Sequence, residues 1–150
     1  MNIVTQHRHQ RKLRLNNMTA KESYLYGLGR RKSATARARL YDGKGNITIN
    51  DKTAMAYLSD NKTLLAEVTD PLALLGKQKD FDITIKVSGG GLSGQVDAIK
   101  LAIAKAITVK FADLRPTLKK ADLLSRDPRE KERKKYGLRS ARKREQYSKR

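Results

Sequence analysis

Two segments of the chain alternate apolar and polar residues with the two-residue period of a β-strand. Residues 34–41 read ATARARLY, and residues 81–88 read FDITIKVS. Successive side chains of a strand point to opposite faces, so each segment predicts one apolar face and one polar face. In the first segment the alanines and the leucine form the buried face, which leaves Arg37 and Arg39 on the exposed face.

Weaker signals predict two further strands. Residues 24–31, YLYGLGRR, have the character of a short strand in which Gly27 and Gly29 permit a bulge or the close approach of another backbone. The turn sequence DGKG at 42–45 is followed by NITIN at 46–50. We therefore expect the segment 46–50 to return beside the preceding strand as a hairpin.

A longer period, near that of an α-helix, predicts the helices. Residues 51–75 are expected to be helical with a break near Asp70–Pro71, and the longest helix is expected from about Ser93 to Leu114. The dipeptide Arg115–Pro116 is expected to end that helix, and a short basic helix is expected at 117–124. The predicted apolar stripe of the long helix consists of Val96, Ile99, Ile103, Ala106 and Ile107.

The charge of the chain is concentrated at its two ends. The formal net charge is +19 over 150 residues. Residues 1–40 hold 10 lysines and arginines against 1 acid, residues 41–113 hold 9 against 9, and residues 114–150 hold 15 against 5. A balanced middle between two cationic ends indicates a small folded domain with basic extensions. Because charges of one sign at this density repel one another, the expected partner is a polyanion.

These patterns divide the chain into three parts. Residues 1–23 are expected to be a basic, disordered N-terminal extension, residues 24–124 the folded domain, and residues 125–150 an extended basic C-terminal tail. From Ser125 onward the sequence has almost no apolar periodicity. A segment of this composition cannot bury enough apolar surface to fold alone, so we expect a partner to hold it.

The residues that catalysis or metal binding would need are scarce. The chain has no cysteine, and its two histidines, His7 and His9, lie in the polar N-terminal arm without a carboxylate cluster beside them. The sequence therefore predicts no enzyme, no cofactor, no metal site and no small-molecule substrate. No apolar run approaches the roughly 18 residues of a membrane-spanning helix, so no membrane partner is expected either.

The segment GGGLSG at 89–94 fits the dinucleotide-binding pattern G-x-G-x-x-G. That fold requires a second parallel strand after the helix, where this chain is basic and interrupted by proline, and Asp113 falls at the end of the helix instead of a strand. A dinucleotide enzyme is therefore the weaker alternative. Two other roles stay open: the glycines expose backbone N–H groups to a phosphate, or they only allow tight helix–strand packing.

Three strings, in this order, resemble one family: GLGRRKSATARARL at 27–40, GGGLSGQVDAIKLAIAKAI at 89–107 and RDPREKERKKYGLRSARKREQYSKR at 126–150. From about Tyr24 to Arg150 the chain resembles the ribosomal protein S nine family, the ninth protein of the small subunit, in its bacterial or organellar form. The resemblance implies an α+β domain like the second domain of ribosomal protein S five. That domain has a small mixed four-stranded sheet with helices packed on one face, and here it would carry extended basic N- and C-terminal tails.

The same resemblance implies a structural constituent of the small ribosomal subunit, located in its head. The implied partners are the small-subunit ribosomal RNA, neighbouring head proteins and the P-site tRNA. The ribosome would be cytoplasmic, with an organellar ribosome as the alternative. Contact with the anticodon stem-loop of the tRNA falls on Ser148, Lys149 and Arg150. Glu145 departs from the family pattern, and its negative charge would weaken that contact locally.

The residues expected to contact ribosomal RNA lie in the first strand pair, the glycine loop and the tail. They are Arg30, Arg31, Lys32, Arg37, Arg39, Gly89, Gly90, Gly91, Arg126, Arg129, Arg133, Lys134, Lys135, Arg139, Arg142, Lys143 and Arg144. The charge alone would also permit a nucleoid DNA-binding protein. Such a protein would need a dimerisation surface and a recognition helix or β-ribbon arm, and the sequence shows neither.

Overall fold

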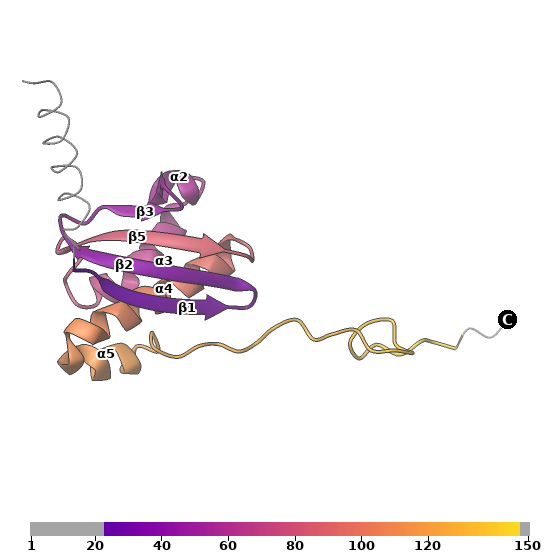
Figure 1. Cartoon of the computed structure of the whole chain (residues 1–150). Helices are drawn as coiled ribbons and strands as arrows, with labels where there is room; N and C mark the ends of the chain where they lie inside the picture. The colour runs from indigo at the N-terminus through magenta and orange to yellow at the C-terminus, as the bar shows by residue number, and fades with distance from the viewer. Residues whose placement is uncertain (1–22, 148–150) are drawn as a thin grey trace, which may run out of the picture.

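The chain folds into an α+β domain from which the C-terminal segment extends as a long tail (Figure 1). The computed structural model describes residues 23–147. Helices α3 and α4 lie on one face of the sheet (Figure 1). In chain order the elements are β1 (Leu25–Arg31), β2 (Ala34–Asp42), β3 (Ile47–Ile49), β4 (Lys52–Thr53), α2 (Ala54–Tyr57), α3 (Lys62–Ala73), β5 (Phe81–Ser88), α4 (Leu92–Lys110), the 3-10 turn η1 (Ala112–Leu114) and α5 (Arg115–Lys120).

The sheet has five strands, one more than the four that the resemblance implied, in the order β1-β2-β5-β3-β4. It is mixed, as expected, because β3 and β5 run parallel while the other neighbours run antiparallel. The additional strand is β4, in which Thr53 lies opposite Thr48 of β3. A strand of two residues spans a single period of alternation, so the sequence pattern could not reveal it.

The expected hairpin between 34–41 and 46–50 is wrong, although both strands form. β5 lies between β2 and β3, antiparallel to the first and parallel to the second. Its apolar face is buried along the whole strand, from Phe81 to Val87, which suits it to the centre of the sheet. The hairpin forms instead between β1 and β2, where Lys32 takes a left-handed φ of 50°.

The helical region after β4 is divided earlier than the sequence predicted. A bend with positive φ at Ser59 and Asp60 separates α2 from α3. The side chain of Asn61 then caps α3 by accepting two hydrogen bonds from backbone N–H groups of its first turn. The expected break near Asp70–Pro71 is wrong, because Pro71 lies buried inside α3.

Helix α4 confirms the predicted apolar stripe, all of whose residues are fully buried. The helix ends at Lys110, short of the expected Leu114, and η1 follows it. Pro116 lies in the first turn of α5, where its missing N–H leaves no helical bond unmade. It therefore begins a helix instead of ending one, and α5 covers 115–120 instead of 117–124.

The edge strand β1 lies in backbone contact with α4. A Cβ atom on Gly27 would stand 2.0 Å from the carbonyl oxygen of Ala102, and one on Gly29 would stand 1.9 Å from that of Ala98. Both glycines are buried. Only a residue without a side chain fits at these distances, which confirms the close backbone approach expected at the two glycines.

Replacing either glycine should therefore destabilise the domain. We expect Gly29→Ala to lower the free energy of unfolding by about 3 kcal/mol, because the methyl group forces β1 and α4 apart. Gly94→Ala is the matched control: its Cβ would have its nearest neighbour at 3.8 Å. Within α4 this alanine should raise stability by up to about 1 kcal/mol. Denaturant unfolding followed by circular dichroism measures both, and equal effects would contradict the contact.

Candidate nucleic-acid interface

The face of the sheet turned away from α4, called here the open face, is cationic. Residues directly opposite each other on neighbouring strands share a face of the sheet. The pairing of the strands therefore determines which side chains are neighbours on the open face. Arg37 of β2 lies between Leu28 of β1 and Lys86 of β5, and Arg39 lies opposite Tyr26. The two arginines, the lysine and the tyrosine are exposed. The open face thus combines positive charge with an accessible aromatic ring.

The cations of the open face lack acidic partners. No ion pair within residues 23–147 involves Arg30, Arg37, Arg39 or Lys86. The guanidinium of Arg39 lies over the ring of Tyr24, 5.1 Å from its centroid. Arg37 and Lys86 are cross-strand neighbours of like charge, an arrangement that destabilises a sheet. An anion bound across this pair would remove the repulsion, so the surface suits a polyanion.

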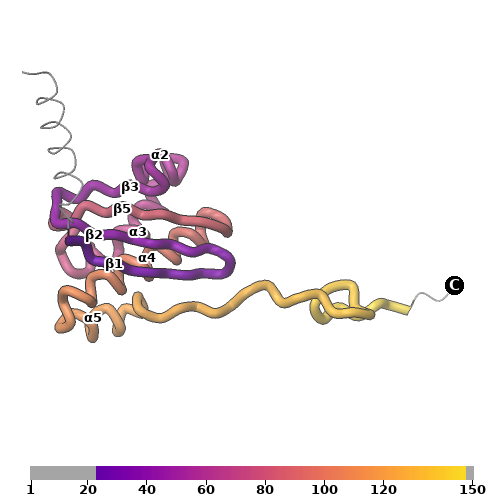
Figure 2. Tube along the Cα trace, in the orientation of Figure 1, coloured from indigo at the N-terminus to yellow at the C-terminus, as the bar shows by residue number. Residues whose placement is uncertain are grey.

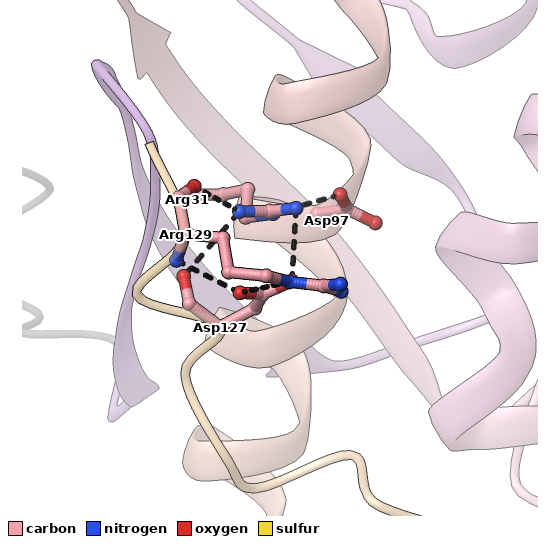
Figure 3. A network of polar contacts seen from close by, with 4 residues as sticks. All are labelled: Arg31, Asp97, Asp127 and Arg129. Carbon is pink, nitrogen blue, oxygen red and sulfur yellow. Dashed lines mark hydrogen bonds and ion pairs between the residues drawn. The ribbon is translucent and has the colours of Figure 1, made fainter. Parts of the chain in front are cut away.

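Arg31, the last residue of β1, points toward α4 and the tail (Figure 3). Its Nε donates to Asp97 Oδ2 on α4 at 3.4 Å. Its Nη1 donates to the backbone carbonyls of Arg129 at 2.8 Å and Asp127 at 3.4 Å, and its Nη2 pairs with Asp127 Oδ2 at 2.9 Å. All three guanidinium nitrogens have partners inside the protein, and the side chain is only 15% exposed.

The carboxylate of Asp127 lies between two arginines (Figure 3). Its Oδ1 accepts the backbone N–H of Arg129 at 2.9 Å, as in an Asx turn, and both oxygens pair with the Arg129 guanidinium. The hydrogen bond from the Arg129 side chain lowers the pKa of Asp127 to about 2, and the positive charge of Arg31 acts in the same direction. Asp127 in turn raises the pKa of Arg129.

The tail, residues 125–147 of the described chain, contains no helix or strand. It runs past the β1 edge of the sheet and then away from the domain (Figure 1, Figure 2). Farther along, Glu132 accepts a hydrogen bond from Arg142 Nε at 2.8 Å and so closes a loop within the tail. Gly137 supplies a φ of 71° in this loop. The neighbouring Tyr136 is fully exposed.

The glycine loop before α4 packs against the turn between β1 and β2. Gly89 and Gly90 have φ values of 74° and 67°, and a Cβ on them would stand 2.4 Å from Ser33 O and 2.9 Å from Ala34 Cβ. These two glycines are therefore needed for tight packing, but against the β1–β2 turn and the start of β2 instead of between helix and strand. Gly91, the N-cap of α4, has open space around its Cβ position. A phosphate contact at its N–H stays a prediction.

The fold after α4 argues against a dinucleotide site. In the described part of the chain, α4 is followed by η1 and α5 and by no strand, and Asp113 lies in η1. The same residues include no group of three metal-ligating side chains, and His7 and His9 lie outside them. None of the described helices is long and apolar enough to cross a bilayer.

The residues predicted to bind RNA are divided between separate surfaces. Arg30, Arg37 and Arg39 share the open face, and most of the others lie along the tail. Arg31 differs from them, because each of its three guanidinium nitrogens already has a partner within the protein. Residues 148–150, predicted to contact tRNA, lie outside the described chain.

Three residues that the structure places at these surfaces carry only weak signals in the sequence: Tyr26, Lys86 and Asp127. Lys86 occupies a polar position of the alternation in β5, so a knowledge of strand pairing would have placed it beside Arg37. Tyr26 was hidden in a glycine-rich segment with weak alternation. Asp127 is one acid in a basic run, and no sequence signal linked it to Arg31, 96 residues earlier.

A small α+β domain with a cationic sheet face and a long basic tail is typical of proteins that bind nucleic acid. The family model described as ribosomal protein S9/S16 matches residues 29–150. The chain belongs to this family, which confirms the resemblance found in its sequence.

Curated relatives agree. The chain is 51% identical over 131 residues to small ribosomal subunit protein uS9 of Cyanothece sp., an alignment that covers 87% of this chain and 96% of the relative. It is 50% identical over 129 residues to the uS9 protein of Solidesulfovibrio magneticus, covering 86% and 98%. It is 49% identical over 125 residues to that of Nostoc punctiforme, covering 83% and 91%. These identities support the same family assignment.

The contact between Asp127 and its two arginines should persist into mild acid. The pKa of Asp127 is lowered from 3.8 to about 2 in the folded protein. A carboxyl with a depressed pKa contributes its full stabilisation above its ordinary pKa and loses it as the pH falls through the folded value. The amide resonance of Arg129, followed by NMR, should therefore shift only below pH 3.8, toward a midpoint near 2.

Two charged groups contact this carboxyl directly, those of Arg31 and Arg129. Asp97 of α4 pairs with the other side of Arg31. In Asp127→Asn the shift should disappear, because the amide does not titrate. A midpoint near the ordinary value in the unsubstituted protein would contradict the contact.

Proposed function

We propose that this chain is a structural constituent of the small ribosomal subunit. It binds the small-subunit ribosomal RNA in the head of the subunit, and its C-terminal tail contacts the P-site tRNA. The family supports the assignment to the ribosome. The RNA contact is supported by the open face, where Arg37, Arg39 and Lys86 are exposed and have no acidic partner among residues 23–147.

The open face has the chemistry that RNA binding needs. Its arginines and lysine bind phosphate oxygens, which position a protein on RNA without reading its sequence. Tyr26 is 47% exposed beside Arg39, where its ring is able to stack on an unpaired base. Ribosomal RNA offers both groups together, which duplex DNA does not, because the bases of a duplex are already stacked and paired.

The tail would provide a second RNA contact, through an extended segment instead of a folded surface. It has no core of its own, and its exposed cations follow one another along an extended backbone. Such a segment follows a phosphate backbone and becomes ordered as it binds. Its proposed RNA ligands are Arg126, Arg133, Lys134, Lys135, Arg139, Arg142, Lys143 and Arg144.

Substitutions on the open face should reduce the salt dependence of RNA binding. Arg37→Ala and Arg39→Ala should each lower the slope of log affinity against log salt concentration by about 0.9, because each removes one phosphate contact. Filter binding to small-subunit ribosomal RNA over a series of salt concentrations measures the slope. Lys105→Ala, an exposed lysine of α4, is the control and should leave it unchanged.

Two outcomes would contradict this interface. The first is an equal loss of slope in Lys105→Ala, which would show that binding is spread over the whole surface. The second is competition by duplex DNA as effective as that by unlabelled ribosomal RNA at the same salt concentration. That result would favour the nucleoid alternative.

The end of the tail should serve tRNA more than assembly. Deleting residues 148–150 removes the terminal Lys149 and Arg150 and leaves every described contact in place. We expect the protein to fold and to enter small subunits at nearly the normal level. Affinity of those subunits for P-site tRNA should fall roughly threefold to tenfold, as for the loss of one or two solvent-exposed ion pairs. If the shortened protein fails to enter subunits, the segment serves assembly instead.

A further inference from the structure

We propose that Arg31 and Asp127 form a clamp that fixes the direction in which the tail leaves the domain. Arg31 is then a positioning residue and not an RNA ligand, although it lies in a run of basic residues. The inference rests on the proposed function only for the RNA that the tail meets farther along. The clamp itself is a property of the free protein.

The tail depends on Arg31 for its polar attachment to the domain. Within residues 23–147, every hydrogen bond and ion pair that joins the tail to the domain involves this side chain. Just before the tail, Leu123 and Leu124 still pack against the hydrophobic core. The root of the tail, residues 125–130, is therefore held by the bonds of a single arginine. Removing that side chain should release it.

The root is shaped to meet a guanidinium. Asp127 forms an Asx turn with Arg129, and the proline between them restricts Asp127 to extended backbone. This turn directs the carbonyls of Asp127 and Arg129 at one nitrogen of Arg31, while the carboxylate meets another. The planar guanidinium presents its donors in fixed directions, which an ammonium does not. Lysine should therefore be a poor substitute at this position.

The clamp has no net charge left for RNA. It joins two arginines, Arg31 and Arg129, to two aspartates, Asp97 and Asp127. A phosphate could reach Arg31 only by displacing a carboxylate from a side chain that is 15% exposed. The preceding residue, Arg30, is exposed on the opposite face of β1 and has no such partner. Two consecutive arginines of one strand thus have different roles, because alternate side chains point to opposite faces.

Because the clamp lies at the root, it controls the position of the far end of the tail. Residues 131–147 span at most about 60 Å when fully extended. A rotation of about 10° at the root would then displace the far end by at most about 10 Å. Fixing the root reduces the volume that the tail must search for its RNA contacts, and part of the ordering is complete before binding.

A distance measurement on the free, full-length protein tests the clamp directly. The chain has no cysteine, so a pair of spin labels can be placed at Lys105→Cys in α4 and Lys131→Cys just beyond the root. Both positions are exposed. Pulsed electron paramagnetic resonance should give a narrow distribution of distances between the two spin labels. Arg31→Ala and Asp127→Ala should each increase the width of the distribution about twofold, because a few backbone residues at the root regain their conformational freedom.

Matched variants separate the clamp from general effects of charge. Arg30→Ala removes the same charge from the neighbouring residue and should leave the distribution narrow. Arg31→Lys keeps the charge but loses the guanidinium, and should broaden the distribution. The double variant of Arg31→Ala with Asp127→Ala should be no broader than either single one, because both remove one interaction. Asp127 lies outside the domain, so its substitution leaves the fold intact and keeps the test valid.

RNA binding provides the second arm of the experiment. Arg31→Ala should weaken binding about tenfold through the lost ordering of the tail, yet leave the salt slope unchanged. Arg37→Ala should lower the slope by about 0.9. A loss of slope in Arg31→Ala would identify Arg31 as a phosphate ligand and overturn the proposal, as would an equally broad distribution before and after its substitution. If instead the slope of Arg37→Ala is unchanged, the proposed RNA interface fails while the distances still decide the clamp.

Discussion

The structure depends on the contact between the backbones of β1 and α4. Gly27 and Gly29 allow the helix to lie against the edge strand at a distance that no other residue permits. This contact fixes the rotation of β1 about its own axis, and with it the face to which each of its side chains points. Arg30 consequently lies on the open face, and Arg31 comes within reach of Asp97 on the helix.

The same alternation separates the two tasks of a very basic protein. Cations on the open face have no carboxylate partner in the described part of the chain and are available to an external polyanion. Other cations pair with acids and link parts of the fold, as Lys100 does with Asp70 at 3.4 Å and Arg31 with Asp127. Composition counts both kinds alike, so net charge indicates the class of partner but not the residues that meet it.

The sequence predicted those parts of the fold whose pattern repeats along one segment. Strands β2 and β5 and the apolar stripe of α4 follow from periodicity, because each has a buried face many residues long. The order of the strands did not follow, since alternation shows which face is buried but not which strand is the neighbour. Alternation alone therefore predicted that Arg37 and Arg39 are exposed. It did not predict that Lys86 lies beside Arg37, or that Arg31 pairs with Asp127. These depend on residues brought together only by the fold.

Most of the acidic residues in the basic tail have a structural role, which the net charge of the tail does not indicate. Each negative charge weakens the attraction to RNA, so a segment that served attraction alone would carry none. Three of the four acids in the described tail are paired: Asp127 with Arg31 and Arg129, Glu130 with Arg126, and Glu132 with Lys135 and Arg142. A chain of cations without them would repel itself and sample many conformations. These acids therefore restrict the shape of the tail at a small loss of charge, and they favour a tail that is partly organised before it meets its RNA.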